Sequence, residues 1–176
     1  MGNLIESYDF KLVESGCAPG AGRWGVLVSL PEDISAVFPY LNAEFGNTSY
    51  DYENKTLIIR DLNQAYAFRP AEIRIARTED PDHARQIAAE LIEKVNRIWR
   101  ERERITPAFK DKRPVAVIDI FKLLPKTNCR NCGYLTCLAY AADLRQGAAR
   151  LEDCPALALP EYVDNRQKIT ALFAAL

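Results

Sequence analysis

The sequence predicts an α+β fold, in which an N-terminal antiparallel sheet with helices precedes a small, mainly helical C-terminal domain. The first observation is a series of short β-rich runs that fills the N-terminal part of the chain and leads into a long amphipathic helical pattern. The second is a change of pattern after residue 114, where four of the five cysteines gather between positions 129 and 154. A polar, proline-marked segment separates the two patterns, so we expect domains at 1–110 and 111–176.

The strands of the predicted sheet follow from β-forming residues divided by turn residues. Residues 10–14 and 24–30 are separated by a segment rich in Gly and Pro, which predicts a hairpin. Four further runs predict an antiparallel meander, at 48–52, 56–60, 64–68 and 72–76.

The helices of the N-terminal domain follow from apolar residues at intervals of three and four. After Pro31 such a pattern runs to Leu41, and we expect Pro39 to kink or end this helix early. From Pro81 to Trp99 the apolar stripe lasts about five turns, which predicts a long amphipathic helix.

The C-terminal domain has two helical segments of its own outside the cysteine region. Residues 115–124 are apolar enough for a strand or a short helix. Residues 161–176 place apolar side chains on one helical face, so we expect a final helix that packs back on the protein.

The composition excludes several classes of function. The chain has 176 residues, of which 48% are hydrophobic and 27% charged, as in ordinary soluble globular proteins. Its 23 Lys and Arg balance 24 Asp and Glu, so no overall positive field favours nucleic acid or anionic lipid. No apolar run approaches the roughly 20 residues of a membrane helix, and the N-terminus lacks the features of a secretory signal. We therefore expect a cytoplasmic protein without nucleic-acid or membrane partners.

The cysteine spacing points to a cofactor. Cys129, Cys132, Cys137 and Cys154 form the pattern Cys-x2-Cys-x4-Cys-x16-Cys, with Pro155 directly after the last. Four thiolates are what a cubane iron–sulfur cluster requires, one for each iron. Structural zinc sites usually use two Cys-x2-4-Cys knuckles, whereas here one loop supplies three ligands and a distant residue supplies the fourth. The spacing favours a [4Fe-4S] cluster, with zinc as the alternative.

The residues around these cysteines favour the same interpretation. Gly133 permits a tight loop, and Asn128 and Asn131 are turn formers. Thr136 can cap a helix that begins at Cys137, which would place that thiolate at a positive helix N-terminus. Gly147 can end this helix before the chain returns to Cys154.

The cysteine segment resembles a known cluster domain. The run from Asp119 through Cys129-Arg-Asn-Cys132-Gly-Tyr-Leu-Thr-Cys137, with the return Leu-Glu-Asp-Cys154-Pro, is similar to the [4Fe-4S] domain of the corrinoid iron–sulfur protein large subunit. It also resembles the cluster regions of the acetyl-CoA decarbonylase/synthase gamma subunit and of the Rnf complex B subunit. The resemblance covers about residues 115–157 and implies that all four cysteines are cluster ligands. It does not extend to the corrinoid-binding barrel or the Rnf membrane anchor.

The complete architecture looks like small stand-alone (Fe-S)-binding proteins of anaerobes, whose N-terminal domain has segments similar to Leu30-Pro-Glu-Asp-Ile-Ser and Pro39-Tyr-Leu-Asn-Ala. We therefore expect low-potential one-electron transfer to a redox partner, such as a corrinoid protein or another metalloenzyme of anaerobic metabolism. The N-terminal domain would be a docking or regulatory module. The alternative is a protein-binding module with a structural or sensing cluster. An enzyme is disfavoured, because four cysteines saturate the cluster and leave no coordination vacancy.

Other motifs favour ordinary structural roles. Gly20-Ala-Gly22-Arg-Trp-Gly25 fits the dinucleotide pattern, but a strand rather than a helix is expected after it, so we interpret it as a hairpin loop. Cys17 is an isolated thiol without an assigned role, and His83 is expected on a helix surface. A set of arginines could offer guanidinium groups to an anionic partner only if the fold clusters them: Arg60, Arg69, Arg74 and Arg77.

Overall fold

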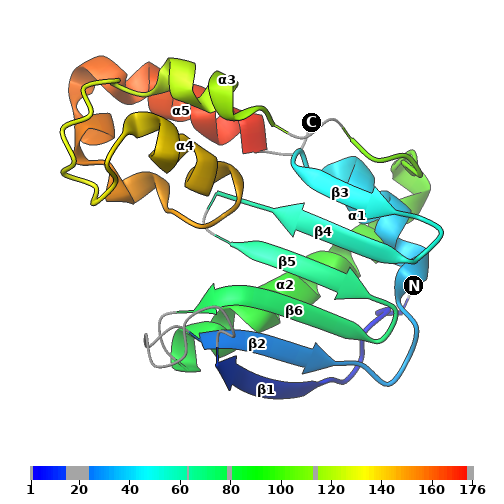
Figure 1. The fold of residues 1–176 in the computed structure, drawn as a ribbon. Helices are drawn as coiled ribbons and strands as arrows, with labels where there is room; N and C mark the ends of the chain where they lie inside the picture. The colour runs from blue at the N-terminus through cyan, green and yellow to red at the C-terminus, as the bar shows by residue number, and fades with distance from the viewer. Residues whose placement is uncertain (1, 15–23, 63, 79–80, 113–114, 174–176) are drawn as a thin grey trace.

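The protein consists of a six-stranded sheet covered by two helices and a second lobe of short helices at one end of the sheet (Figure 1). The computed structural model describes residues 2–14, 24–62, 64–78, 81–112 and 115–173. This arrangement confirms the predicted α+β class with an antiparallel sheet. Cys17 and most of the glycine-rich motif at 20–25 lie outside the described residues.

The strands pair in the order β1-β2-β6-β5-β4-β3, and every pair is antiparallel. Their bounds are Asp9–Glu14 (β1), Trp24–Ser29 (β2), Thr48–Asp51 (β3), Thr56–Arg60 (β4), Ala65–Arg69 (β5) and Glu72–Thr78 (β6). The β1–β2 hairpin and the β3–β6 meander are as predicted. Because a strand begins at Trp24, the glycine motif does not open a helix and lacks the context of a dinucleotide site.

Two helices of the N-terminal body, which is the sheet with the helices packed on it, cover one face of the sheet. They are α1 (Phe38–Glu44) and α2 (Pro81–Glu101). Alternate strand residues such as Val28, Ile59 and Phe68 are fully buried against them, as the period of two in a half-buried strand requires. Helix α2 contributes its apolar stripe, and the predicted long helix is confirmed.

The expectation for Pro39 is wrong. The chain forms a 3-10 turn, η1 (Ser35–Val37), and α1 begins at Phe38 with Pro39 in its first turn. A proline is well accommodated there because the first N–H groups of a helix have no intrahelical acceptor. Residues 31–34 are not helical, since the Ile34 N–H donates to the Pro70 carbonyl at 2.7 Å and joins this segment to the turn before β6.

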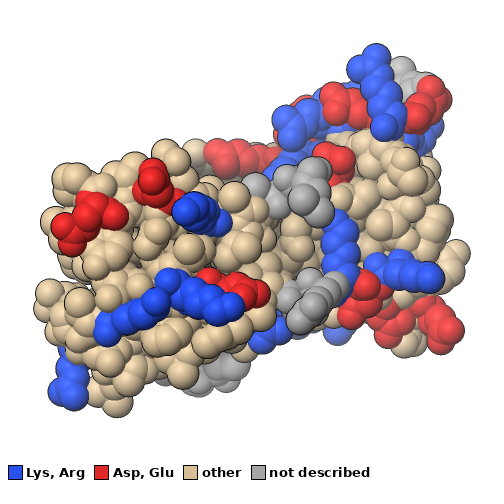
Figure 2. Space-filling view, turned by 90° about the horizontal axis from the view of Figure 1, so that it is seen from above, with Lys and Arg blue, Asp and Glu red and all other residues tan. Residues whose placement is uncertain are grey.

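The second lobe has its own hydrophobic core. Its helices are α3 (Val117–Leu123), α4 (Cys137–Arg145) and α5 (Val163–Phe173), with 3-10 turns η3 (Leu151–Asp153), η4 (Pro155–Ala158) and η5 (Pro160–Tyr162). The segment at 115–124, left open between strand and helix, is therefore helical. Ile120, Tyr140, Leu144 and Ile169 are fully buried in this core. Seen from above, the surface of this lobe is largely uncharged, with only scattered acidic and basic groups (Figure 2).

The two lobes touch at the turn between β4 and β5. Leu62 from this turn packs against the core of the second lobe. Gly147, with φ +66°, lies so close that an added Cβ would be 2.9 Å from the Gln64 carbonyl oxygen. The side-chain amide of buried Asn47 donates to the Arg145 carbonyl at 3.1 Å. The end of α4 is thus fixed against the edge of the sheet.

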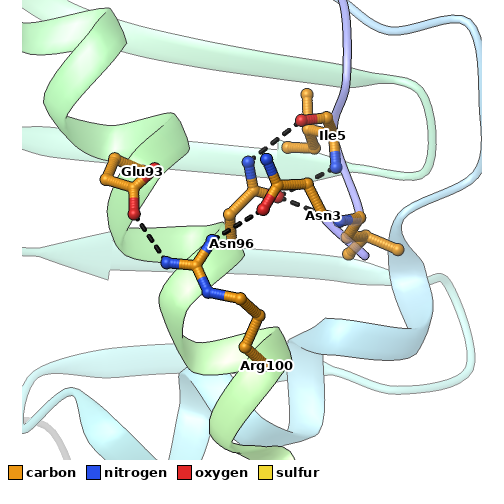
Figure 3. A network of polar contacts seen from close by, with 6 residues as sticks. Asn3, Ile5, Glu93, Asn96 and Arg100 are labelled. Atoms are coloured by element: carbon orange, nitrogen blue, oxygen red, sulfur yellow. Dashed lines mark hydrogen bonds and ion pairs between the residues drawn. The ribbon is translucent and has the colours of Figure 1, made fainter. Parts of the chain in front are cut away.

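The N-terminal segment is fixed by a buried polar residue of α2 (Figure 3). Asn96 is 3% exposed, and its Oδ1 accepts the N–H groups of Leu4 and Ile5 at 3.0 and 2.9 Å. Its Nδ2 donates to the Ile5 carbonyl at 2.9 Å. At the surface, Arg100 donates to Asn3 at 2.6 Å. An asparagine on the apolar face of α2 therefore replaces the backbone partners that this segment would have in a sheet.

Among the described helices, none is long and apolar enough to cross a bilayer.

Candidate functional site

The four cysteines of the motif line one small pocket in the second lobe. Cys129 and Cys132 lie in the loop after α3, Cys137 is the first residue of α4, and Cys154 lies between η3 and η4. Cys129 is exposed and Cys132 is half-buried, whereas Cys137 and Cys154 belong to the lobe's hydrophobic core. The thiols therefore run from a solvent-facing edge to the interior.

The loop that carries the first two cysteines has an unusual backbone. Lys126, Asn128 and Arg130 have left-handed φ values of 62°, 49° and 63°, and Gly133 has φ 83°. Left-handed backbone costs roughly 1 kcal/mol or more for a residue with a Cβ, except where Asn tolerates it. The loop is held in this shape by its own bonds, since the Gly133 N–H donates to the Arg130 carbonyl at 2.9 Å. The sequence indicates the turns at Asn128 and Gly133, but nothing in it reveals those at Lys126 and Arg130.

Two side chains join this loop to α4. The Cys137 N–H donates to Asn128 Oδ1 at 2.8 Å, which sets the loop against the start of the helix. Thr136 caps the helix, as predicted, with its Oγ1 accepting the Ala139 N–H at 3.1 Å. The Cys137 thiol therefore lies in the first turn of α4, as the sequence predicts.

The return to Cys154 is held by Tyr140. Its hydroxyl donates to the carbonyl of Arg150 at 2.8 Å, and the Leu151 carbonyl lies 3.2 Å away. Burial raises the pKa of Tyr140, so the hydroxyl keeps the proton that it donates. Gly147 ends α4 with its left-handed backbone, as predicted, and the chain then turns back along the helix.

The thiols have different electrostatic surroundings. The pKa of Cys129 is lowered by the N–H of Asn131 and by the hydroxyl of Thr127, which favour its thiolate. The pKa of Cys154 is raised, chiefly by burial. A bound metal would oppose this effect, because a metal favours the thiolate form of its cysteine ligand.

The donor set fits an iron–sulfur group. Among the described lining residues of this pocket, the cysteine thiols are accompanied by no carboxylate or imidazole, so the available ligands are soft sulfur atoms. Within the described part of the chain, no three Cys, His, Asp or Glu side chains form a ready site for a single metal ion.

Comparison with known proteins identifies the class of this lobe. Residues 124–156, which include all four cysteines, match the family described as "Putative Fe-S cluster". The C-terminal part of the chain is therefore similar to an iron–sulfur cluster domain.

Similar segments occur in larger proteins. The acetyl-CoA decarbonylase/synthase complex subunit gamma of Methanocaldococcus jannaschii is 43% identical over 60 residues, which are 34% of this chain and 12% of that subunit. The corrinoid/iron-sulfur protein large subunit of Moorella thermoacetica is 50% identical over 42 residues, covering 24% and 9% of the two chains. The similarity thus spans a small part of these relatives. No solved structure matches the chain.

The remaining sequence candidates lie away from the cysteine pocket. His83 is half-buried and lines a pocket of about 540 Å³ between α2 and the segment at 150–152. Arg69 and Arg74 both pair with Glu72, at 3.9 and 2.6 Å. Arg60 lines a separate pocket with Arg145, and the side chain of Arg77 lies outside the described residues. The four arginines suggested by the sequence therefore do not form one cluster in the described structure.

Proposed function

We propose that this protein binds one [4Fe-4S] cluster through Cys129, Cys132, Cys137 and Cys154 and transfers single electrons to a partner protein. The observation that carries the proposal is the single pocket lined by four thiols, with Cys129 exposed and the deeper cysteines buried. Electron transfer falls steeply with distance, so a carrier needs one edge of its cofactor near the surface. A cluster at these cysteines would have that edge at Cys129.

The chain's own residues would hold and tune the group. When bound, a cysteine-ligated cluster supplies a reversible one-electron couple, whose potential depends on hydrogen bonds, burial and nearby charge. The Asn131 N–H and the Thr127 hydroxyl favour the thiolate of Cys129. The capped N-terminus of α4 holds Cys137 at the wall of the pocket. The apolar lobe keeps water from the inner ligands.

The surface beside the pocket supports docking of a protein partner. Leu135 and Leu138 flank Cys137 in sequence and are 72% and 48% exposed. Leu159 and Val163, which follow Cys154, are also exposed. We infer that these exposed apolar side chains contribute to one interaction surface. We propose a redox partner such as a corrinoid protein or another metalloenzyme of anaerobic metabolism, acting in the cytoplasm.

In this proposal the chain is an electron carrier and not itself an enzyme. Residues 111–176 form the cluster domain, and residues 1–110 form a docking or regulatory domain. The separate hydrophobic cores of the two lobes support this division.

A second candidate is a protein-binding module with a structural or sensing cluster. The burial of Cys137 and Cys154 within the lobe's core favours it, because a group held there also contributes to folding. The two candidates differ in whether the cluster is reduced reversibly.

The test is anaerobic purification followed by a dithionite titration monitored by absorption and EPR spectroscopy, with iron, sulfide and zinc measured on the same sample. We expect four irons per chain, reversible bleaching near 400 nm, and loss of the cluster in Cys137→Ser. Cys17→Ser is the matched control, because Cys17 lies outside the four-cysteine motif, and it should retain the cluster. Stoichiometric zinc would overturn the cluster assignment, and a cluster that is destroyed on reduction would overturn electron transfer.

A further inference from the structure

A second pocket, away from the cysteines, lies where the edge of the sheet meets the end of α4. Its volume is about 260 Å³, and its walls carry three cations, a carboxylate and two hydroxyl groups: Arg60, Lys112, Arg145, Asp111, Ser49 and Thr48. The charged side chains sum to +2 at neutral pH, three positive and one negative. The N-terminal body contributes Arg60 from β4, and the second lobe contributes Arg145 from the last turn of α4.

One buried residue fixes the backbone of both arginines. The carbonyl of Asn47 accepts the Arg60 N–H at 2.9 Å. The side-chain amide of the same residue donates to the Arg145 carbonyl at 3.1 Å. Asn47 is 1% exposed, so these bonds are shielded from water. The buried contact between the two lobes therefore fixes the backbone from which each arginine reaches the shared pocket.

The other charged groups of the pocket are already engaged. The ammonium of Lys112 donates to the carbonyls of Ala43 and Phe45, both at 2.9 Å. The carboxylate of Asp111 accepts the Tyr50 N–H at 2.9 Å. Each group therefore has a structural role, and each also adds its charge to the pocket.

In the described structure, neither arginine of the pocket, Arg60 nor Arg145, has a salt-bridge partner. Burial, and then the charge of Arg145, lower the pKa of Arg60, while Asp111 offsets part of that effect. Two half-buried like charges that face one pocket repel each other, and a bound anion would remove that repulsion.

We propose that this pocket binds the phosphate group of a small phosphorylated ligand and that the bound phosphate joins the two lobes. Two guanidinium forks and the Ser49 hydroxyl can donate to the several oxygens of a phosphate, and the charge of +2 matches its dianion. A single carboxylate would use only one of the forks. The volume leaves space for a small organic group beside the phosphate. This assignment is independent of the cluster and its redox chemistry.

The test is calorimetric titration of the full-length holoprotein with inorganic phosphate and pyrophosphate at constant ionic strength, with chloride and malonate as comparison anions. We expect saturable binding of phosphate or pyrophosphate that weakens at least tenfold in Arg145→Gln and in Arg60→Lys. Arg74→Gln should bind as the unaltered protein does, because Arg74 lies on the same sheet but pairs with Glu72. The visible spectrum of the cluster should not change in any variant.

Three results would overturn the proposal. Binding that does not saturate, or that chloride matches, would mean only a diffuse positive field. Equal binding in Arg145→Gln and the unaltered protein would place the anion elsewhere. Tighter binding of malonate than of either phosphate probe would assign the pocket to carboxylates. Thermal unfolding of each variant checks that it is folded. If Arg145→Gln does not fold, Arg60→Lys tests the pocket in its place, because it keeps the positive charge and removes only the guanidinium fork.

Discussion

The hydrophobic cores of the two lobes contain different kinds of side chain. In the N-terminal body, aliphatic and aromatic side chains of the sheet pack against α1 and α2, and no cysteine belongs to the described core. In the C-terminal lobe, Cys137 and Cys154 are themselves core residues. The first lobe can bury its apolar surface with its own side chains, whereas the second includes the proposed ligands of a metal group. If these cysteines hold a cluster as proposed, the stability of the second lobe depends on that cluster.

The backbone differs between the lobes in the same sense. In the described part of the N-terminal body, Lys55 is the one non-glycine residue with a left-handed φ, and it lies in the turn between β3 and β4. The cysteine loop contains three such residues within five positions, Lys126, Asn128 and Arg130. Strain of this density persists only where the surroundings impose it. A bound cluster would supply that constraint through Cys129 and Cys132.

Removal of the cluster is the strongest test of the proposed difference in stability between the two lobes. We expect chelation of iron under mild oxidation to unfold residues 115–173 while the sheet remains folded, because the ligands are part of only one core. Limited proteolysis followed by mass spectrometry should then find cuts throughout α3–α5 and few within the strands. Protection of α3–α5 that is unchanged in the apo protein would show that the second lobe folds without its metal group.

The buried Asn96 tests how self-sufficient the N-terminal body is. Asn96→Ala leaves the N–H groups of Leu4 and Ile5 without their acceptor, and we expect a loss of about 3 kcal/mol in unfolding free energy. Arg100→Ala is the matched control, since it removes only surface contacts, those to Asn3 and Glu93, and should cost less than about 1 kcal/mol. Urea unfolding monitored through the sheet measures both. Equal losses would mean that the burial of Asn96 contributes nothing.

Two glycines of the second lobe separate local strain from contact between the lobes. Both Gly133 and Gly147 have left-handed backbone, but a Cβ on Gly133 meets nothing within 4 Å, whereas one on Gly147 lies 2.9 Å from the Gln64 carbonyl oxygen. We expect Gly133→Ala to cost about 1 kcal/mol and Gly147→Ala about 2 kcal/mol. Thermal unfolding of the holoprotein gives the difference. A smaller loss for Gly147→Ala would mean that the lobes separate at little cost.

The smallest effect is expected from a surface carboxylate of the N-terminal body. Hydrogen bonds from Ser35, and then the contact with Lys55, lower the pKa of Asp33 to about 2. A lowered pKa in the folded state stabilises the protein above the unfolded value near 3.8, and this contribution is lost as pH falls toward 2. Because the Asp33 side chain is 49% exposed, the contribution is below about 1 kcal/mol. Asp33→Asn should flatten the pH dependence of urea unfolding between pH 4 and 2, and an unchanged slope would contradict this.

Local patterns in the sequence were sufficient to predict the sheet and most helices. The meander at β3–β6 and the stripe of α2 follow from periods of two and 3.6, which depend on nearby residues alone. The cap at Thr136 and the helix end at Gly147 follow from equally local chemistry. The prediction that Pro39 kinks or ends the helix is wrong, because the effect of a proline depends on where the helix begins.

Long-range contacts were not predictable in this way. Nothing local to Asn96 indicates that it binds residues 4 and 5, and nothing local to Arg60 indicates that Arg145 lies in the same pocket. The candidate cysteines are a partial exception, since their spacing alone suggested one site and the structure lines one pocket with all four. Their role as ligands of a [4Fe-4S] cluster stays a prediction.

Helix α4 has a mechanical consequence for the exposed thiol edge. Its nine residues carry Cys137 at one end and Arg145 at the other, so a rod of about 12 Å connects the cysteine pocket to the sheet. Because Asn47 fixes the C-terminal end of α4 to the edge of the sheet, a rotation of that edge would move α4 and the cysteine pocket with it. The N-terminal body is therefore connected through α4 to the part of the pocket that holds Cys137, and under the proposed function a ligand that stiffens this contact would restrict how a partner approaches the cysteines.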